Sequence, residues 1–313
     1  MSSTLGAVPA TAASPLWDGY CADPFVLPLP DGGYLMYGTA PGLLPDGRAF
    51  QVLASDDGEH WEPAGGALSV EEEPPPGTEW WAPEVACADG RYWMYYSRGI
   101  GHAGHRLFVA VADDPAGPFV TVGPALTPDL SFAIDASPFQ DDDGSWWLFF
   151  ATDLVEGERP GTVLAVQRLL GMTELTGSPR IILRASADWQ RYLADREMYG
   201  GRHDWHTLEG PAVVRLADRY LLMYSGGNFQ TPGYGMAAAS ADSVLGPWVE
   251  DPQGPFVTSE STGLHGPGHC SLVAPAEGDL EVYLHAWDVE GTRRRPHRLV
   301  VDTSQERPRV LPG

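Results

Sequence analysis

A short pattern recurs five times along the chain: a turn rich in Asp and Gly leads into a segment of alternating aromatic and aliphatic residues. The copies read DGGYLMYGT (31–39), DGRYWMYYS (89–97), DGSWWLFFA (143–151), ADRYLLMYS (217–225) and GDLEVYLHA (278–286). Each copy is typical of a hairpin turn followed by a β-strand. Aligned on Tyr34, Tyr92, Trp146, Tyr220 and Leu280, the copies lie 58, 54, 74 and 60 residues apart. The repeat therefore predicts an all-β fold.

A second pair of predicted strands follows each copy, for example around 50–61 and 106–119, and the last such pair, at 293–302, is degenerate. Four strands per unit in five units is the arrangement of a five-bladed β-propeller, whose blades close around a channel. We expect one five-bladed β-propeller domain over 1–313, with 1–16 as a flexible N-terminal segment. The long fourth interval predicts an insertion around 184–207.

Composition restricts the partners and the compartment. The 313 residues carry a net charge of −23, which disfavours nucleic acid and anionic membranes as partners. No stretch has the length of a membrane span, and the first residues lack the basic start and apolar region of a signal peptide. The three cysteines cannot all pair within the chain. We therefore expect a cytoplasmic protein with reduced thiols.

Five equivalent positions of the repeat hold residues suited to chemistry. Eleven residues before each aligned position stand Asp23, Trp81, Asp135, Glu209 and His269. Since the first strand of each propeller blade lines the axis, these side chains are predicted to surround one pocket. Glu84 is a rival carboxylate outside this register, expected to support the site by hydrogen bonding.

Carboxylates that face each other across a pocket are what glycoside hydrolysis requires. One acid protonates the leaving oxygen, and one base activates a water molecule on the opposite face of the sugar. A third carboxylate raises the pKa of the acid, because like charges resist joint ionisation. Trp81 offers a platform on which a sugar ring can stack, although packing between blades explains a tryptophan there equally well.

The motifs that hold these residues resemble glycoside hydrolase family 43 over essentially the whole chain. The matching segments are ADPF (22–25), WAPEV (81–85), IDASPF (134–139), LEGPAVV (208–214) and GPGHCSLV (266–273). The resemblance implies a five-bladed propeller that acts with inversion, exo-acting on α-L-arabinofuranosyl or β-D-xylosyl linkages of plant-polysaccharide oligosaccharides.

The resemblance also implies a role for individual residues. Asp23 matches the general base, Glu209 the general acid, and Asp135 the carboxylate that tunes and orients the acid. Arg298 resembles an arginine that contacts substrate, whereas the cluster Arg293–Arg295 is expected at the surface. His269 matches a histidine that contacts substrate or lies near a hydrated structural calcium ion in the channel; a single histidine does not by itself define a metal site, so a buried structural role stays open.

Three other functions are compatible with the fold. A non-catalytic carbohydrate-binding propeller would need no ring of carboxylates. A phosphorylase would need a cationic phosphate site, and few Arg and no Lys lie near the motifs. The invertases and fructan hydrolases, which retain configuration, carry NDPNG, RDP and EC where this chain has ADPF, IDAS and EGP. All three are disfavoured.

Overall fold

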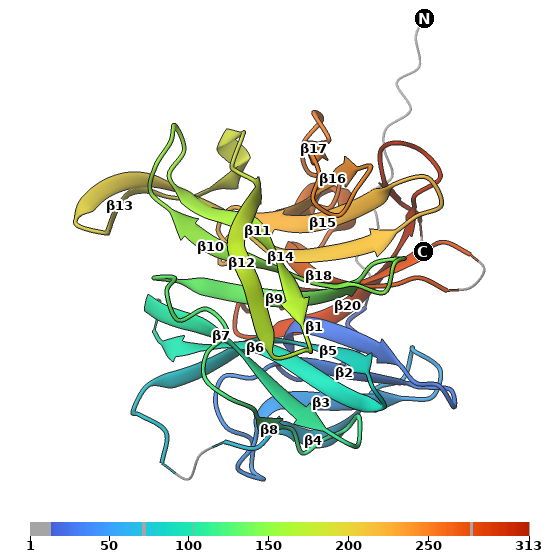
Figure 1. The fold of residues 1–313 in the computed structure, drawn as a ribbon. Helices are drawn as coiled ribbons and strands as arrows, with labels where there is room; N and C mark the ends of the chain where they lie inside the picture. The colour runs from blue at the N-terminus through green and yellow to red at the C-terminus, as the bar shows by residue number, and fades with distance from the viewer. Residues whose placement is uncertain (1–13, 71–72, 102, 276–277, 313) are drawn as a thin grey trace, which may run out of the picture.

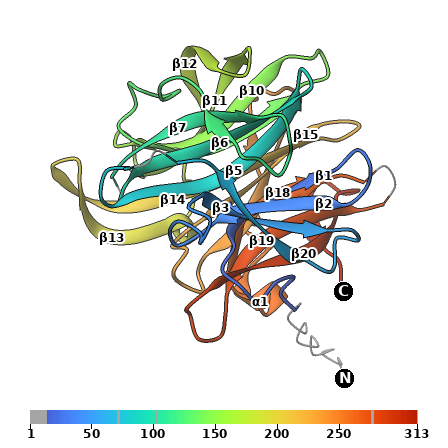
Figure 2. The same ribbon diagram turned by 90° about the horizontal axis from the view of Figure 1, so that it is seen from below.

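A computed structural model describes residues 14–70, 73–101, 103–275 and 278–312. Nearly all regular structure is β-strand, arranged in five antiparallel four-stranded blades, which confirms the predicted five-bladed propeller (Figures 1 and 2). The predicted flexible segment 1–16 lies largely outside the described residues. Across these ranges, neither helical segment has the length or the apolarity needed to cross a membrane.

Each blade is built from consecutive strands. Blade 1 contains β1 (Ala22–Pro28), β2 (Tyr34–Thr39), β3 (Ala49–Ser55) and β4 (Glu62–Leu68). Blade 2 contains β5 (Thr78–Ala88), β6 (Arg91–Ile100), β7 (Ala103–Ala112) and β8 (Val120–Thr121). Blade 3 contains β9 (Ala133–Gln140), β10 (Trp146–Leu154), β11 (Gly161–Leu170) and β12 (Glu174–Leu183).

Blades 4 and 5 follow the same order. Blade 4 contains β14 (Gly201–Arg215), β15 (Tyr220–Gly226), β16 (Gly235–Ala241) and β17 (Val249–Glu250). Blade 5 contains β18 (His265–Val273), β19 (Leu280–Trp287), β20 (Arg294–Asp302) and β21 (Arg309–Val310). A 3₁₀ turn, η1 (Asp188–Gln190), precedes β13, and a short helix, α1 (Ser259–Thr262), precedes β18.

The apolar core lies between the blades. Clusters of buried side chains fill the space between blades 1 and 2, 2 and 3, 3 and 4, 4 and 5, and 5 and 1. The last cluster closes the ring, with Trp61 of blade 1 edge-on to Tyr283 of blade 5 at 6.3 Å between ring centroids. Backbone bonds from Leu16 and Cys21 to β20 add to this closure. The alternating aromatics of the repeat are therefore the residues that pack neighbouring blades together.

The insertion predicted around 184–207 forms the hairpin of β13 (Arg191–Met198) with the first half of β14, which extends outward beyond the blades in Figure 1. The same part of β14 pairs in parallel with β11 at Gly161 and His206, and this pairing joins blades 3 and 4 into one sheet. A Cβ atom at Gly161 would lie 2.0 Å from the carbonyl oxygen of His206, so only glycine permits this approach.

Candidate active site

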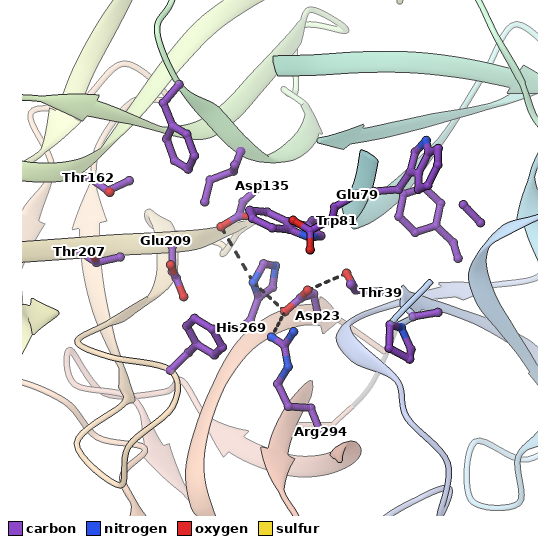
Figure 3. A pocket seen from close by; sticks show the side chains of 18 of the residues that line it. Asp23, Thr39, Glu79, Trp81, Asp135, Thr162, Thr207, Glu209, His269 and Arg294 are labelled. Carbon is purple, nitrogen blue, oxygen red and sulfur yellow. Dashed lines mark hydrogen bonds and ion pairs between the residues drawn. The ribbon is translucent and has the colours of Figure 1, made fainter. Parts of the chain in front are cut away.

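Residues from all five blades line one pocket, shown in Figure 3. The cavity has a volume of about 300 Å³, at the lower end of the range for small-molecule sites. Its polar lining includes Asp23 and Thr39 of blade 1, Asp135 of blade 3, Glu209 of blade 4, and His269 and Arg294 of blade 5. Trp80 and Trp81 of blade 2 and Phe229 contribute aromatic surface.

Every inner strand carries a β-bulge where it reaches the pocket. Pairing with the second strand is interrupted in β1, β5, β9, β14 and β18. One residue of each bulge has a positive φ: Asp23 (51°), Ala82 (48°), Asp135 (59°), Gly210 (57°) and His269 (49°). Such conformations are rare outside glycine and cluster at functional sites. In Figure 3 the Asp23, Asp135 and His269 side chains, each borne on its bulge, point into the pocket.

The predicted equivalence of five side chains is wrong in two blades. Asp23, Asp135 and His269 do share one position, but in blades 2 and 4 that position holds Ala82 and Gly210. Trp81 and Glu209 precede it by one residue and pair with Ser97 and Ser225 of the second strand. The hairpin turn that follows the inner strand is one residue shorter in these two blades, so a fixed count back from the second strand overshoots by one. Both side chains nevertheless line the pocket.

Asp23 is held in its ionised form. Burial alone would raise its pKa, but Arg294, His269 and His285 outweigh burial and hold the pKa well below the usual value. Nη1 of Arg294 lies 3.3 Å from Oδ1 of Asp23, and the hydroxyl of Thr39 donates to Oδ2 at 2.6 Å. At neutral pH this carboxylate can therefore accept a proton from a bound water molecule.

The pKa values of Glu209 and Asp135 are raised, in contrast to that of Asp23. Burial, together with the negative charge of Asp135, raises the pKa of Glu209 to about 7. Burial and the charge of Asp23 likewise raise the pKa of Asp135. The N–H of Gly210, next to Glu209, donates to Oδ2 of Asp135 at 2.9 Å, and Tyr234 donates to Oε1 of Glu209 at 2.7 Å. Glu209 can therefore keep a proton at a pH where an exposed glutamate has lost it.

Arg298, predicted to contact substrate, is not among the residues of the pocket. It pairs with Glu59 and Glu281 at the periphery of blade 5. The arginine that lies beside Asp23 in the pocket is Arg294, in the cluster expected at the surface. Four residues along a strand span about 13 Å, which separates the pocket end of β20 from Arg298. The structure therefore places Arg294, and not Arg298, at the pocket.

Arg294 is enclosed by aromatic rings. Its guanidinium lies 5.6 Å from the ring of Tyr20, 5.1 Å from that of Phe229 and 5.8 Å from that of Trp287. Its Nε also donates to the hydroxyl of Tyr20 at 3.0 Å. These contacts fix the charge beside Asp23 and leave it little freedom to move.

The other predicted residues lie in or beside the pocket. Trp81 lines it, with its ring stacked on that of His105 at 3.7 Å between centroids. Nδ1 of His269 lies 3.4 Å from Oδ1 of Asp23 and 4.0 Å from Oδ2 of Asp135. The rival carboxylate Glu84 is not among the residues that line the pocket. Burial raises its pKa, and its side chain hydrogen-bonds Ser137.

The side chains around His269 supply few ligands for the predicted calcium ion. Across the described residues, no three His, Cys, Asp or Glu side chains are grouped so that they could hold a metal. Calcium prefers six to eight oxygen ligands, so an ion beside His269 would depend on water for most of them. No chemical step is assigned to such an ion.

Several residues of the site carry no motif that reveals them in the sequence. Tyr234 lies 25 residues after Glu209, to which it donates. A Cβ atom at Gly268 would meet the Tyr234 ring at 2.1 Å, so this glycine makes room for it. Tyr192, Arg196 and Met198 reach the pocket from β13, and only the length of the insertion pointed to them. Thr39 could have been noticed in the sequence, because it is the last residue of the first copy of the repeat.

Comparison with known proteins agrees with this geometry. An extracellular exo-α-(1→5)-L-arabinofuranosidase of Streptomyces avermitilis is 27% identical over 280 residues, which cover 84% of this chain and 54% of that protein. A xylosidase/arabinosidase of Bacteroides ovatus is 27% identical over 224 residues, which cover 64% of this chain and 65% of that protein. The chain thus spans between about half and two thirds of the length of these relatives.

A solved structure and a family model also match this chain. The crystal structure of a thermostable family-43 glycoside hydrolase superposes with a TM-score of 0.81 at 28% identity, covering 96% of each chain. The family model described as Glycosyl hydrolases family 43 matches residues 12–301, a span that includes every inner-strand bulge and Arg294. With Asp23, Asp135 and Glu209 in one pocket at the meeting point of five blades, this chain belongs to glycoside hydrolase family 43.

Proposed function

We propose that this chain is an inverting glycoside hydrolase that releases terminal α-L-arabinofuranosyl or β-D-xylosyl residues from plant-polysaccharide oligosaccharides. The observation that carries the proposal is the opposite protonation of two carboxylates in one pocket. The pKa of Asp23 is held low, and the pKa of Glu209 is raised to about 7. Two carboxyl groups whose environments push their pKa values apart are suited to act as a base and an acid.

The reaction is a single displacement. Asp23 removes a proton from a water molecule whose oxygen attacks the anomeric carbon, while Glu209 gives its proton to the glycosidic oxygen that leaves. One C–O bond forms as the other breaks, and attack from the opposite face inverts the anomeric configuration. Asp23 ends protonated and Glu209 ionised, and exchange with solvent restores both.

The neighbouring groups support these two roles. Asp135 places a negative charge near Glu209 and so keeps the acid protonated. Arg294 and Thr39 hold Asp23 by charge and by hydrogen bond, which keeps it ionised and oriented. The aromatic surface of Trp80, Trp81 and Phe229 can stack against the apolar face of a sugar ring.

The two sugars are proposed from the printed names of the relatives and from the family resemblance. α-L-Arabinofuranose and β-D-xylose are both pentoses, and the residues that would tell them apart lie on the rim, at 41–42 and on β13. A hydrated calcium ion near His269 stays a prediction, tested by metal analysis of the purified protein and by the effect of a chelator on its thermal stability.

A panel of aryl glycosides tests the proposal. The purified chain is assayed on aryl α-L-arabinofuranoside, β-D-xyloside and hexoside controls, beside Asp23→Asn and Glu209→Gln. We expect turnover of at least one pentoside and a loss of about 10²-fold or more on it in Asp23→Asn. Glu209→Gln should show a loss of the same order on an oligosaccharide, whose poor leaving group requires the acid. Inactivity on every pentoside, or variants as active as the wild-type chain, would refute it.

A further inference from the structure

Four of the five inner-strand bulges share one way of satisfying their backbone. The N–H of the residue with positive φ donates to a side chain of the second strand in the preceding blade. Ala82 donates to Oγ1 of Thr39 at 2.8 Å, Asp135 to Oγ of Ser97 at 3.0 Å, His269 to Oγ of Ser225 at 2.7 Å and Asp23 to Nδ1 of His285 at 3.0 Å. A buried N–H needs such an acceptor, because leaving it unpaired is costly.

The four acceptors occupy the same place in their blades. Each lies five residues after the aligned position of the repeat and pairs with the residue just before the bulge. The pairs are Thr39 with Ala22, Ser97 with Trp81, Ser225 with Glu209, and His285 with Gly268. This register repeats in blades 1, 2, 4 and 5, so each of these four blades presents an acceptor to the next blade.

Blade 3 breaks the pattern. The corresponding residue of β10 is Ala151, which pairs with Ile134 and is fully buried. A methyl group cannot accept a hydrogen bond. The N–H of Gly210, the bulge residue of the next blade, donates instead to Oδ2 of Asp135 at 2.9 Å. The catalytic-site carboxylate thus takes the place that a hydroxyl or imidazole fills in the other four blades.

We propose that Ala151 is a positioning residue: by offering no acceptor, it leaves the Gly210 N–H to Asp135 and so fixes that carboxylate beside Glu209. The inference rests on the proposed function, in which Glu209 is the acid. Asp135 belongs to blade 3 and Glu209 to blade 4, so this bond sets the position of the one relative to the other.

A hydroxyl at position 151 should compete for the same N–H. Thr39, Ser97 and Ser225 show that this place in a blade accommodates a hydroxyl that accepts from the next bulge. Asp135 would then lose a donor that favours its ionised form and its present orientation. With less negative charge held near it, Glu209 would give up its proton at a lower pH.

The test compares Ala151→Thr with Ala151→Val. The two introduced side chains have nearly the same volume, and only threonine carries an acceptor. Both variants and the wild-type chain are assayed across pH on an oligosaccharide, whose poor leaving group requires the acid. We expect Ala151→Thr to lose about tenfold or more in kcat relative to Ala151→Val, with its alkaline limb about one pH unit lower. Ala151→Ser, the smallest change, replaces threonine if that variant does not fold.

Equal losses in Ala151→Thr and Ala151→Val, or wild-type kinetics in Ala151→Thr, would overturn the inference while leaving the proposed hydrolysis intact. Inactivity of the wild-type chain would instead refute the proposed function. A crystal structure of Ala151→Thr separates the two questions. Its introduced hydroxyl should accept from the Gly210 nitrogen, and a hydroxyl that points elsewhere contradicts the inference whatever the activity.

Discussion

The hydroxyl of Thr39 donates to Oδ2 of Asp23 at 2.6 Å and at the same time accepts the N–H of Ala82 at 2.8 Å. Because the oxygen accepts from the next blade, its own hydrogen is directed at the carboxylate. One residue therefore ties the spacing of blades 1 and 2 to the orientation of the proposed base.

Removing this hydroxyl should impair both the orientation of Asp23 and the contact between blades 1 and 2. Thr39→Val keeps the shape of the side chain but removes the donor to Asp23 and the acceptor for Ala82. We expect kcat to fall about tenfold and the acid limb of the pH profile to move up, since Asp23 loses a hydrogen bond to its charged form. The unpaired N–H should cost about 1–3 kcal/mol of unfolding free energy. Thr39→Ser is the control, because it retains the hydroxyl; equal behaviour of the two variants would contradict this role.

The dependence of kcat/KM on pH follows from the two carboxylates. The base must be ionised, and because the pKa of Asp23 is held well below its usual value, it stays ionised as the pH falls through the range in which an exposed aspartate takes up a proton. The acid must be protonated, and with a pKa of about 7 Glu209 loses its proton as the pH rises through that value. We expect a profile that falls on the alkaline side near pH 7. In Asp135→Asn the alkaline limb should move to lower pH, because the like charge that raises the pKa of Glu209 is gone; a limb that stays in place would argue against this coupling.

Substitutions of two arginines of β20, one in the pocket and one at the periphery, should have different effects on activity. Arg294→Met removes the cation 3.3 Å from Asp23, so we expect a loss of about 10²-fold in kcat/KM and a higher acid limb. Arg298→Met removes a peripheral pair with Glu59 and Glu281 and should leave kcat/KM within about twofold of the wild-type value. Steady-state kinetics on one aryl glycoside measures both, and the reverse order of effects would restore the assignment made from sequence.

The β13 hairpin should contribute to binding the part of a longer substrate that departs as the leaving group. Arg196 lines the pocket, with its guanidinium 4.9 Å from the ring of Tyr192 and 5.6 Å from that of Trp205. Arg196→Ala is expected to raise KM for an oligosaccharide about threefold to tenfold and to leave KM for an aryl glycoside nearly unchanged. Arg202→Ala is the matched control on the same hairpin, since Arg202 pairs with the exposed Asp195 outside the pocket. An equal rise for both substrates would place Arg196 beside the cleaved sugar instead.

The blades could be predicted because their residues repeat a simple physical pattern. Aromatic residues such as Tyr37, Tyr95 and Phe149 recur at fixed places in the repeat and are buried between blades. Period-two burial and an Asp-Gly turn are local properties, so they are visible without tertiary information. Asp23, Asp135 and Glu209 were found because they stand eleven residues before the aligned position of the repeat, in motifs that resemble glycoside hydrolase family 43.

The register and the electrostatic partners could not be predicted in the same way. The hairpin turn is one residue shorter in blades 2 and 4 than in blades 1 and 3, so counting back a fixed number of residues placed Trp81 and Glu209 one residue out. Arg294 was misassigned because adjacent arginines look alike in sequence, whereas the strand direction puts only one of them beside Asp23. Tyr234 reaches Glu209 from a loop after β15, a contact that depends on the fold as a whole.

The central claim is that Asp23 and Glu209 act together, as base and acid, in one displacement. Proton NMR of the sugar first released from an arabinofuranoside or xyloside tests this most directly, provided that spectra are taken before mutarotation. The account predicts that the first product has the inverted anomeric configuration and equilibrates afterwards. A first product with the configuration of the substrate would show a double displacement and would contradict the roles given to both residues.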